Sequence, residues 1–374
     1  MIEGLRRDPL LSRYEGWRAF AETPPQSPPE RLTAGALRQL SNEARDEYNE
    51  RRGSYHSTFL VRTPAVGRIL THLWDLVESS RQGPDRVKGA AVIDAPPALG
   101  KSTVANAFGR EFHLQQVHRH GSTLDGGQTE HIPVCRVGFT GSMTTRALNE
   151  SILNFYAHPA ADSARNRYLR NRNLATVAAD CVHRHGTRLI IVDDVHFLRI
   201  HTQEGVAVAN ELKWLANEYP ATFLFTGVDM GRTGLLSEGH RDGRTAMSQT
   251  ARRWTLLSLE PFKPPALDEQ RTWDSLLATI EVKLVLAHAG PGMLRNESDY
   301  LYARSSGIIG SLFELIIRAC ARAIRNGDER LTRELFEEVR IDAAAEDRRA
   351  PLEAELAAHA SAKRQLTRPS VLNP

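Results

Sequence analysis

The segment Ala91–Thr103, with the sequence AVIDAPPALGKST, decides the fold. A short apolar run leads into a loop that closes on Gly-Lys-Ser-Thr. This order is typical of a β-strand, a phosphate-binding loop and the N-terminus of a helix. We therefore expect a nucleotide-binding loop made by Ala95, Pro96, Pro97, Ala98, Leu99, Gly100, Lys101, Ser102 and Thr103.

The residues at the end of this loop suit the parts of a bound Mg²⁺·ATP. Gly100 lets the backbone approach a phosphate because it has no Cβ. Lys101 can reach the β- and γ-phosphates, and the Ser102 hydroxyl can ligate Mg²⁺. Ala95 replaces the first glycine of the common pattern and precedes two prolines, which favours a stiff loop without a positive φ at that position. The alternative is a chance Gly-Lys-Ser-Thr at the start of an ordinary helix.

A second segment, Arg188–Asp194 (RLIIVDD), places two acids at the end of a continuous apolar run. Such a run is typical of a buried parallel strand. We expect Asp193 to hold Mg²⁺ through water and Asp194 to polarise the water that attacks the γ-phosphate. An ordinary core strand followed by a helix-capping acid would show the same pattern. The phosphate loop favours the metal–nucleotide interpretation.

Apolar strands alternate with helices through the middle of the chain. The patterns predict strands at 89–94, 132–139, 189–193, 221–227 and 254–259, and helices at 101–112, 144–156, 165–181 and 204–218. This alternation predicts an α/β fold with a five-stranded parallel sheet and helices on both faces. After Pro261 the strands stop, and helices at 268–287, 308–325 and 332–345 predict a C-terminal helical lid.

We expect four regions along the chain. Residues 1–60 form an N-terminal arm, irregular up to Glu30, and a helical extension in which a polar helix over 33–52 is stopped by Gly53. Residues 61–262 form the nucleotide-binding domain, which opens with a helix capped by Thr63 before Pro64. Residues 263–345 form the lid, and the polar tail 346–374 is expected to be disordered.

Composition sets broad limits on the function. The 374 residues include 48 basic and 45 acidic ones, a net charge of +3 that neither requires nor excludes a nucleic-acid partner. The three cysteines are far apart and form no metal or disulfide pattern, as expected in a reducing cytosol. We find no signal peptide and no stretch of about 20 apolar residues. The sequence therefore predicts a cytoplasmic protein without a membrane partner.

The pentapeptide Val-His-Arg-His-Gly occurs twice, ending at Gly121 and Gly186. His183 and His185 could ligate a metal. The favoured interpretation is that the second copy ends a helix, with Gly186 as a left-handed cap and the cations placed against the negative helix terminus.

A phosphate-loop α/β domain with a helical lid resembles the AAA+ ATPases. Shorter segments resemble the TniB class of transposition ATPases, a group with TnsC- and IstB-like relatives. The nucleotide motifs specify only a P-loop NTPase, and the helix Glu211–Glu218 and the lid segment Ser306–Leu312 carry the narrower resemblance. The resemblance covers residues 55–345 and rests on Tyr55-His56, Val61–Pro64, Asp193–Leu198, Glu211–Glu218, Phe223–Gly227, Ser306–Leu312 and Gly327.

This resemblance implies roles for further residues. Thr226 matches sensor one, which orients the attacking water. Arg252 and Arg253 match an arginine finger that reaches a neighbour's γ-phosphate, a task that suits a planar cation; surface solvation is the alternative. The usual sensor-two arginine falls on Gly310, and Asp194 is one methylene shorter than the glutamate common at its position. Both departures imply slow hydrolysis and a switch rather than a motor.

Two basic segments are candidates for DNA contact. The first is the run Arg165, Arg167, Arg170 and Arg172, which contains Tyr168 and no acid. The second is Thr144, Thr145 and Arg146, which follows the second strand. Contacts of this kind would meet phosphates and carry little sequence information. A solvated helix face is the alternative for both.

The resemblance implies an ATP-dependent regulator of DNA transposition. It would bind ATP and Mg²⁺, assemble head to tail into a ring or helical filament on double-stranded DNA, and recruit or activate a transposase. Two alternatives stay open: a signalling or defence NTPase switch without a DNA role, and a helicase-loader or replication-initiator-type ATPase. A signalling NTPase usually carries a long repeat or effector region, and none is expected after Ala345, which favours the first hypothesis.

Overall fold

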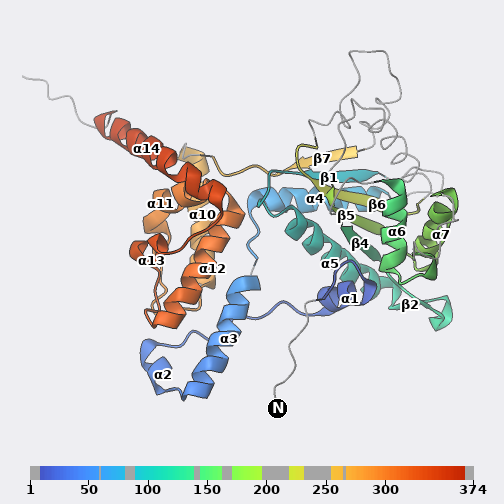
Figure 1. The fold of residues 1–374 in the computed structure, drawn as a ribbon, viewed down its shortest axis with the longest axis horizontal. Helices are drawn as coiled ribbons and strands as arrows, with labels where there is room; N and C mark the ends of the chain where they lie inside the picture. The colour runs from blue at the N-terminus through green and yellow to red at the C-terminus, as the bar shows by residue number, and fades with distance from the viewer. Residues whose placement is uncertain are drawn as a thin grey trace, which may run out of the picture. The chain divides into compact units, whose positions relative to one another are not determined.

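The computed structural model describes residues 9–58, 60–80, 89–138, 144–161, 171–195, 219–230, 254–263 and 267–366. The chain forms two compact units (Figure 1). The first combines residues 1–24 with 64–259 and contains the main sheet. The second combines residues 25–63 with 260–374, and its described elements are helices. This division differs from the expected one, because residues 25–60 do not stand apart from the C-terminal helices.

Five parallel strands form the sheet of the first unit. They are β1 (Ala90–Asp94), β4 (Val134–Gly138), β5 (Leu189–Val195), β6 (Thr222–Gly227) and β7 (Trp254–Ser258). Their order is β4-β5-β6-β1-β7, so β1 lies between β6 and β7. The predicted five-stranded parallel sheet is confirmed. Ligands of such sheets bind beyond the carboxyl ends of the strands, near a point where the strand order reverses.

Helices cover both faces of this sheet. Helix α5 (Lys101–His120) packs against β1, β4, β5 and β6. Side chains alternate along a strand, so Cys135 and Arg136 on β4 face opposite sides. The Cys135 thiol interacts with Tyr156 and Cys181, which belong to the end of α6 (Thr145–Phe155) and to α7 (Asn171–Arg184). These two helices therefore cover the face opposite α5.

The N-terminal arm contains a helix that the sequence analysis did not predict. Helix α1 (Tyr14–Glu22) packs against α5 and buries Trp17 completely. A Cβ on Gly109 of α5 would lie 2.8 Å from the Trp17 ring and 2.5 Å from Ile191 of β5. Gly109 therefore gives the close approach that the indole needs. Helix α4 (Pro64–Ser79) begins at Pro64, as predicted.

Both Val-His-Arg-His-Gly segments end helices. Helix α5 continues well beyond its predicted end at Phe112 and stops before Gly121, whose φ is 84°. Helix α7 ends at Arg184, and Gly186 has a φ of 63°, which confirms the predicted left-handed cap. A short hairpin, β2 (Thr123–Leu124) with β3 (Thr129–Glu130), follows α5 and was not predicted.

The helices of the second unit differ from the predicted ones in both the N-terminal extension and the lid. The helix expected over 33–52 divides at Leu40, which has an extended backbone, and α3 continues through Gly53. Helix α11 was not predicted, and the helix expected over 332–345 ends early at Glu337. The helices are α2 (Ala34–Gln39), α3 (Asn42–Thr58), α10 (Leu267–Lys283), α11 (Ser298–Ser305), α12 (Ile309–Asn326), α13 (Arg333–Glu337) and α14 (Ala343–Leu366).

The C-terminal tail is also different from the prediction, since α14 extends to Leu366. Asp342 caps this helix by accepting the Ala345 N–H at 3.0 Å. The buried Leu356 adds an apolar contact to the core of this unit. A capped helix with a packed face is stable where composition alone suggested disorder. None of the helices among the described residues is both long and apolar enough to span a membrane.

A buried ion pair joins the N-terminal helices to the C-terminal ones. Arg52 of α3 donates to both carboxylate oxygens of Glu329, at 2.6 and 2.7 Å, and both side chains are buried. One turn further along α3, His56 Nε2 accepts the Val285 N–H at 2.9 Å. A bidentate pair of this kind fixes geometry as well as charge. Residues 25–63 are therefore a structural part of the helical unit.

Candidate functional site

The loop after β1 has the geometry of a phosphate-binding loop. Gly100 caps α5 with a left-handed backbone (φ 82°), and Lys101 begins the helix. Ala95 has no positive φ, as predicted, and its N–H donates to Gly227 O at 3.3 Å. Ala98 adopts a φ of 60°, which costs a residue with a Cβ roughly 1–2 kcal/mol. Backbone strain of this kind is concentrated at functional sites.

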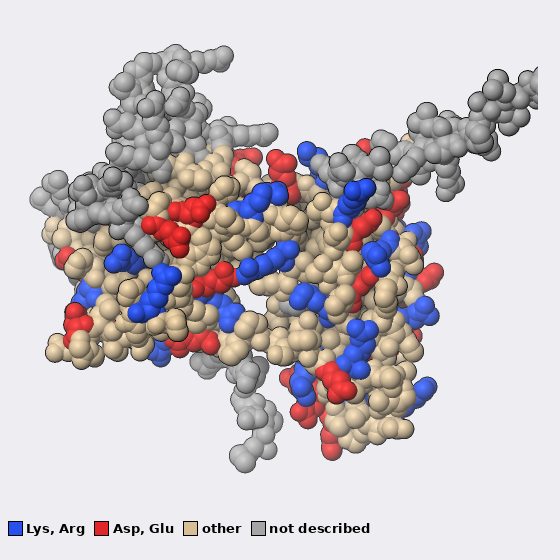
Figure 2. All heavy atoms as spheres, turned by 180° about the vertical axis from the view of Figure 1, so that it is seen from behind, with Lys and Arg blue, Asp and Glu red and all other residues tan. Residues whose placement is uncertain are grey.

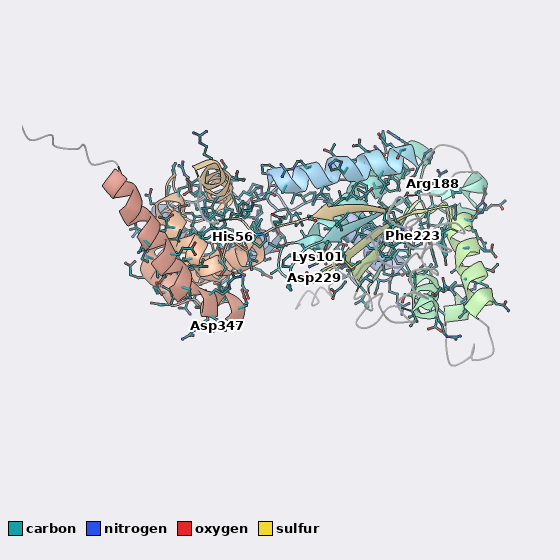
Figure 3. The ribbon with its side chains drawn as sticks, turned by 90° about the horizontal axis from the view of Figure 1, so that it is seen from above. His56, Lys101, Arg188, Phe223, Asp229 and Asp347 are labelled. Carbon is teal, nitrogen blue, oxygen red and sulfur yellow. The ribbon has the colours of Figure 1, made fainter. Side chains whose placement is uncertain are left out.

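The Lys101 side chain lies inside this loop. Its ammonium group donates to Ala95 O at 2.8 Å and to Pro96 O at 2.9 Å. Burial lowers the pKa of Lys101, while the carboxylates of Asp194, Asp94 and Asp193 act in the opposite direction. A cation placed among oxygens with its charge partly desolvated is well suited to bind phosphate oxygens. Figure 3 shows Lys101 and Arg188 at opposite ends of the strands. Lys101 lies beyond the carboxyl end of β1, and Arg188 precedes the amino end of β5.

Asp193 is the point where three strands and α5 meet. This buried carboxylate on β5 accepts from Ser102 Oγ at 2.8 Å and from Thr226 Oγ1 at 2.6 Å, both through Oδ1. Its other oxygen, Oδ2, forms an ion pair with Arg136 of β4. The structure therefore brings together three residues that the sequence analysis assigned to the site, Ser102, Asp193 and Thr226.

Asp194 lies on an irregularity at the end of β5. The register of β5 with β6 shifts between Val192 and Val195, and Asp194 has a φ of 57°. Its N–H donates to Thr226 Oγ1 at 3.0 Å. Bulges re-aim side chains and are common next to active sites. The fully buried Thr226 thus contacts both acids: it donates to the carboxylate of Asp193 and accepts from the backbone of Asp194.

The residues at Asp193 fit a magnesium ion. Mg²⁺ prefers oxygen ligands and is usually held by one or two protein groups together with water and substrate phosphates. The Ser102 hydroxyl and the Asp193 carboxylate are such ligands, and they lie within hydrogen-bond distance beside the phosphate loop. Among the described residues, no group of three or more His, Cys, Asp or Glu side chains forms a separate metal site.

Arg136 is a site residue that sequence reasoning missed. It is the one charged residue within the predicted strand 132–139, and its side chain is 16% exposed. A charged residue is rarely buried in a strand unless it is paired. An arginine inside an apolar strand that ends beside the phosphate loop was therefore a signal that the sequence contained.

The predicted DNA contacts lie mostly outside the described residues. Arg165, Arg167 and Arg170 are among the undescribed residues, and Arg172 belongs to the first turn of α7. Arg146 is in the first turn of α6 and forms an ion pair with Glu150 at 2.8 Å. Thr144 caps that helix, accepting the Ala147 N–H at 3.1 Å. Figure 2 shows Lys and Arg side chains interspersed with Asp and Glu side chains over the described surface of the face that it draws.

Two further predictions fall on undescribed residues. The proposed arginine finger, Arg252 and Arg253, immediately precedes the described strand β7. The helix Glu211–Glu218, which carries part of the narrower resemblance, is undescribed as well. The lid segment Ser306–Leu312 is described: Ser306 and Gly307 adopt left-handed backbones, and Gly310 lies in the first turn of α12.

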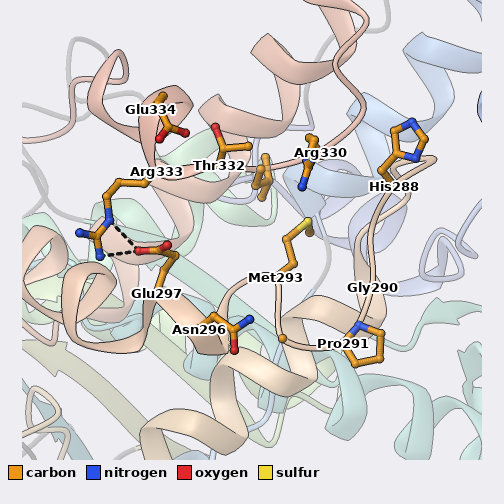
Figure 4. Close-up of a pocket in the computed structure, with 12 residues that line it drawn as sticks. His288, Gly290, Pro291, Met293, Asn296, Glu297, Arg330, Thr332, Arg333 and Glu334 are labelled. Atoms are coloured by element: carbon orange, nitrogen blue, oxygen red, sulfur yellow. Dashed lines mark hydrogen bonds and ion pairs between the residues drawn. The ribbon is translucent and has the colours of Figure 1, made fainter.

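The helical unit contains a cavity of about 390 Å³ (Figure 4). It is lined by residues of the α10–α11 connection and of the segment around α13, among them His288, Met293, Asn296 and Arg333. Arg333 is already paired with Glu297 at 2.6 Å. None of the nucleotide-site residues lines this cavity.

Comparisons with known proteins agree with this geometry. Residues 85–235 match the sequence profile of a family described as an AAA domain. This range contains the phosphate loop, Asp193, Asp194 and Thr226. No curated protein sequence matches the chain.

Many solved structures resemble the chain at low sequence identity, among them the following three. Orc1 from Aeropyrum pernix, in complex with DNA, is 14% identical with a TM-score of 0.52, and the match covers 76% of this chain and 66% of Orc1. Orc2 from the same organism, in ADPNP and ADP complexes, is 15% identical (TM-score 0.46; 86% and 70% covered). Domain III of Thermotoga maritima DnaA is 15% identical (TM-score 0.41; 75% and 92% covered).

Residues 85–235 therefore resemble an AAA domain, and the chain has the AAA+ P-loop fold. It spans just under two thirds of the length of Orc1, and the TM-score above 0.5 indicates a shared fold. The fold class expected from the phosphate loop is confirmed. The TniB class is not indicated by these comparisons.

Proposed function

We propose that this protein is an ATP-dependent switch that assembles on double-stranded DNA, of the kind found in replication initiators and helicase loaders. In this proposal the loop from Ala95 to Thr103 binds ATP, Ser102 and Asp193 hold Mg²⁺, and Asp194 polarises the attacking water. Thr226 orients that water. The observation that carries the proposal is the convergence of Ser102 and Thr226 on Asp193 beside the phosphate loop.

The DNA part of the proposal rests on a structural similarity and on a basic segment. One structure that shares the fold is the Orc1 protein of Aeropyrum pernix, in complex with DNA. The basic run Arg165–Arg172 contains four arginines and no acid. Phosphate contacts from such a run carry little sequence information, and one subunit would bind weakly. An assembly adds the contacts of its subunits by avidity, so binding should require the ATP-bound, assembled form.

Retention of duplex DNA tests the proposal. We expect binding with ATP or a non-hydrolysable analogue, little binding without nucleotide, and a steep loss of affinity between low and moderate salt. Replacing Arg167 and Arg170 by Glu should abolish DNA binding and leave ATP affinity unchanged. The control is Arg119→Glu, an exposed position near the end of α5. Absence of DNA retention at low salt with ATP would favour a nucleotide switch that acts on protein partners.

A regulator of DNA transposition is the second candidate. It is supported by the resemblance of the lid segment Ser306–Leu312 and of the helix Glu211–Glu218 to the TniB class. Its additional partner would be a transposase. Co-purification with a transposase encoded by a neighbouring gene would favour it, and co-purification with a replicative helicase would favour the initiator type.

A further inference from the structure

Arg136 forms a contact that a simple phosphate-loop site does not require. It lies in the middle of β4 between the buried residues Cys135 and Val137. Its guanidinium forms an ion pair with Asp193 Oδ2, and the two side chains are 16% and 7% exposed. Asp193 is the residue that the proposed function assigns to Mg²⁺. A cation of the protein itself therefore lies against the expected metal ligand.

The strand register explains how the arginine reaches this carboxylate. Arg136 pairs with Ile191, and Gly138 pairs with Asp193, so the arginine extends two residues along the sheet. Gly138 leaves room for it, because a Cβ there would lie 3.3 Å from Arg136 Nη1. The sequence thus combines a long cation with a residue that has no side chain, at the edge strand next to Asp193.

The contacts of Asp193 leave little free capacity for a metal ion. Oδ1 accepts two hydroxyl hydrogen bonds, from Ser102 and Thr226, and Oδ2 is paired with the arginine. The Arg136 Nε is buried and has no hydrogen-bond partner among the described residues. The ion pair is therefore one-sided, and a one-sided pair is weaker than a bidentate one.

We propose that Arg136 is a resident counter-ion of Asp193 that a divalent cation must displace when Mg²⁺·nucleotide binds. The inference rests on the proposed function of the site as an ATP-binding site. Both cations need the same carboxylate, and like charges a few ångströms apart repel each other strongly in a partly buried site. The arginine keeps the nucleotide-free site electrically balanced, and it reduces the advantage that Mg²⁺ gives to nucleotide binding.

The quantity to measure is the factor by which Mg²⁺ tightens nucleotide binding. It is the ratio of the dissociation constants of a fluorescent ATP analogue in excess EDTA and in saturating Mg²⁺. In Arg136→Gln the carboxylate loses its counter-ion, so binding should weaken in EDTA and strengthen in Mg²⁺. We expect the factor to rise at least tenfold above that of the wild type. Arg136→Lys keeps the positive charge but not the planar guanidinium, and it should give an intermediate factor.

The matched control is Arg188→Gln. Arg188 is exposed and precedes β5, at the end of the strands opposite the phosphate loop. Its factor should equal that of the wild type. Thermal unfolding checks that each variant is folded, and if Arg136→Gln does not fold, Arg136→Lys decides the question alone. An unchanged or smaller factor in a folded Arg136 variant would overturn the inference while the wild type still binds nucleotide. A wild type that binds no nucleotide in saturating Mg²⁺ would instead overturn the proposed function, and this inference with it.

Discussion

The proposed role of Asp194 as the general base can be tested, because the backbone and the carboxylate of this residue have separate roles. The backbone N–H contacts Thr226, and the left-handed φ of 57° is one that Asn also tolerates. Asp194→Asn should therefore fold and bind ATP with unchanged affinity. Hydrolysis should fall by about 10²–10⁴-fold, the usual contribution of a general base.

The control for this variant is Asp125→Asn. Asp125 lies in the β2–β3 connection and also has a left-handed backbone, with a φ of 50°. The substitution makes the same chemical change at an exposed position, and the Asp125→Asn protein should hydrolyse ATP at the wild-type rate. Steady-state phosphate release measures both variants, and turnover at the parent rate in Asp194→Asn would show that Asp194 is not the base.

His56 gives the helical unit a defined pH dependence. Burial, and after it the nearby Arg52, lower the pKa of His56 to about 4, so the folded state holds the ring neutral. The unfolded value is about 6.5. The stability from the neutral ring is present above pH 6.5 and is lost as the pH falls towards 4. Between pH 7 and pH 5 this loss is about 2 kcal/mol.

Urea unfolding of the wild type and of His56→Gln measures this effect. Gln can still accept the Val285 N–H but does not titrate in this range. The wild type should lose about 2 kcal/mol more than the variant between pH 7 and pH 5. Parallel losses in the two proteins would show that other groups cause the pH dependence.

At the scale of elements, the packing of α1 against α5 allows the strongest test of the core of the first unit. Trp17 is fully buried against Gly109 of α5, the helix that carries Lys101 and Ser102. Trp17→Ala should cost the first unit about 3–5 kcal/mol of unfolding free energy, because it creates a large cavity. Phe20→Ala, on the same helix but only half-buried, should cost less. Equal losses in thermal or urea unfolding would contradict the packing described here.

The strands could be predicted because each is a continuous apolar run, and their alternation with helices fixes a parallel sheet. Helix α1 was missed because the prolines that follow it suggested an irregular arm, although Tyr14, Trp17 and Ala21 recur at helical spacing. The helix over 33–52 was predicted as one because no glycine or proline marks the break at Leu40. There Ser41 caps α3 by accepting the Ala44 N–H.

The candidate site could be predicted in part. The phosphate loop and the acids at the end of β5 each lie within one short segment of sequence. Lys101, Ser102 and Asp193 could therefore be predicted from the sequence. The ion pair with Arg136 depends on which strand lies beside β5, and local sequence does not specify strand order. The same reason explains why residues 25–60 were predicted as a separate extension. Arg52 and Glu329 are far apart in the chain, and only the folded unit brings them together.

At the scale of the whole molecule, we predict that the ATP-bound protein assembles head to tail. Arg252 or Arg253 of one subunit would complete the site of the next, and such contacts form rings or open helices. The double variant Arg252→Ala/Arg253→Ala and the variant Lys101→Ala should each be inactive. A mixture should regain hydrolysis, because an arginine finger contributes about 10³–10⁵-fold in rate. Monomers at all ATP concentrations, with no rescue in the mixture, would contradict this assembly.

The central claim is that the loop after β1 binds Mg²⁺·ATP, and titration of a fluorescent ATP analogue with Lys101→Ala tests it most directly. The loss of the ammonium that now contacts Ala95 and Pro96 should weaken binding by about 100-fold, the effect of one or two charge-assisted hydrogen bonds. Arg119→Ala, at the exposed end of the same helix, should bind like the wild type. Unchanged affinity in a folded Lys101→Ala protein would contradict the assignment of the site.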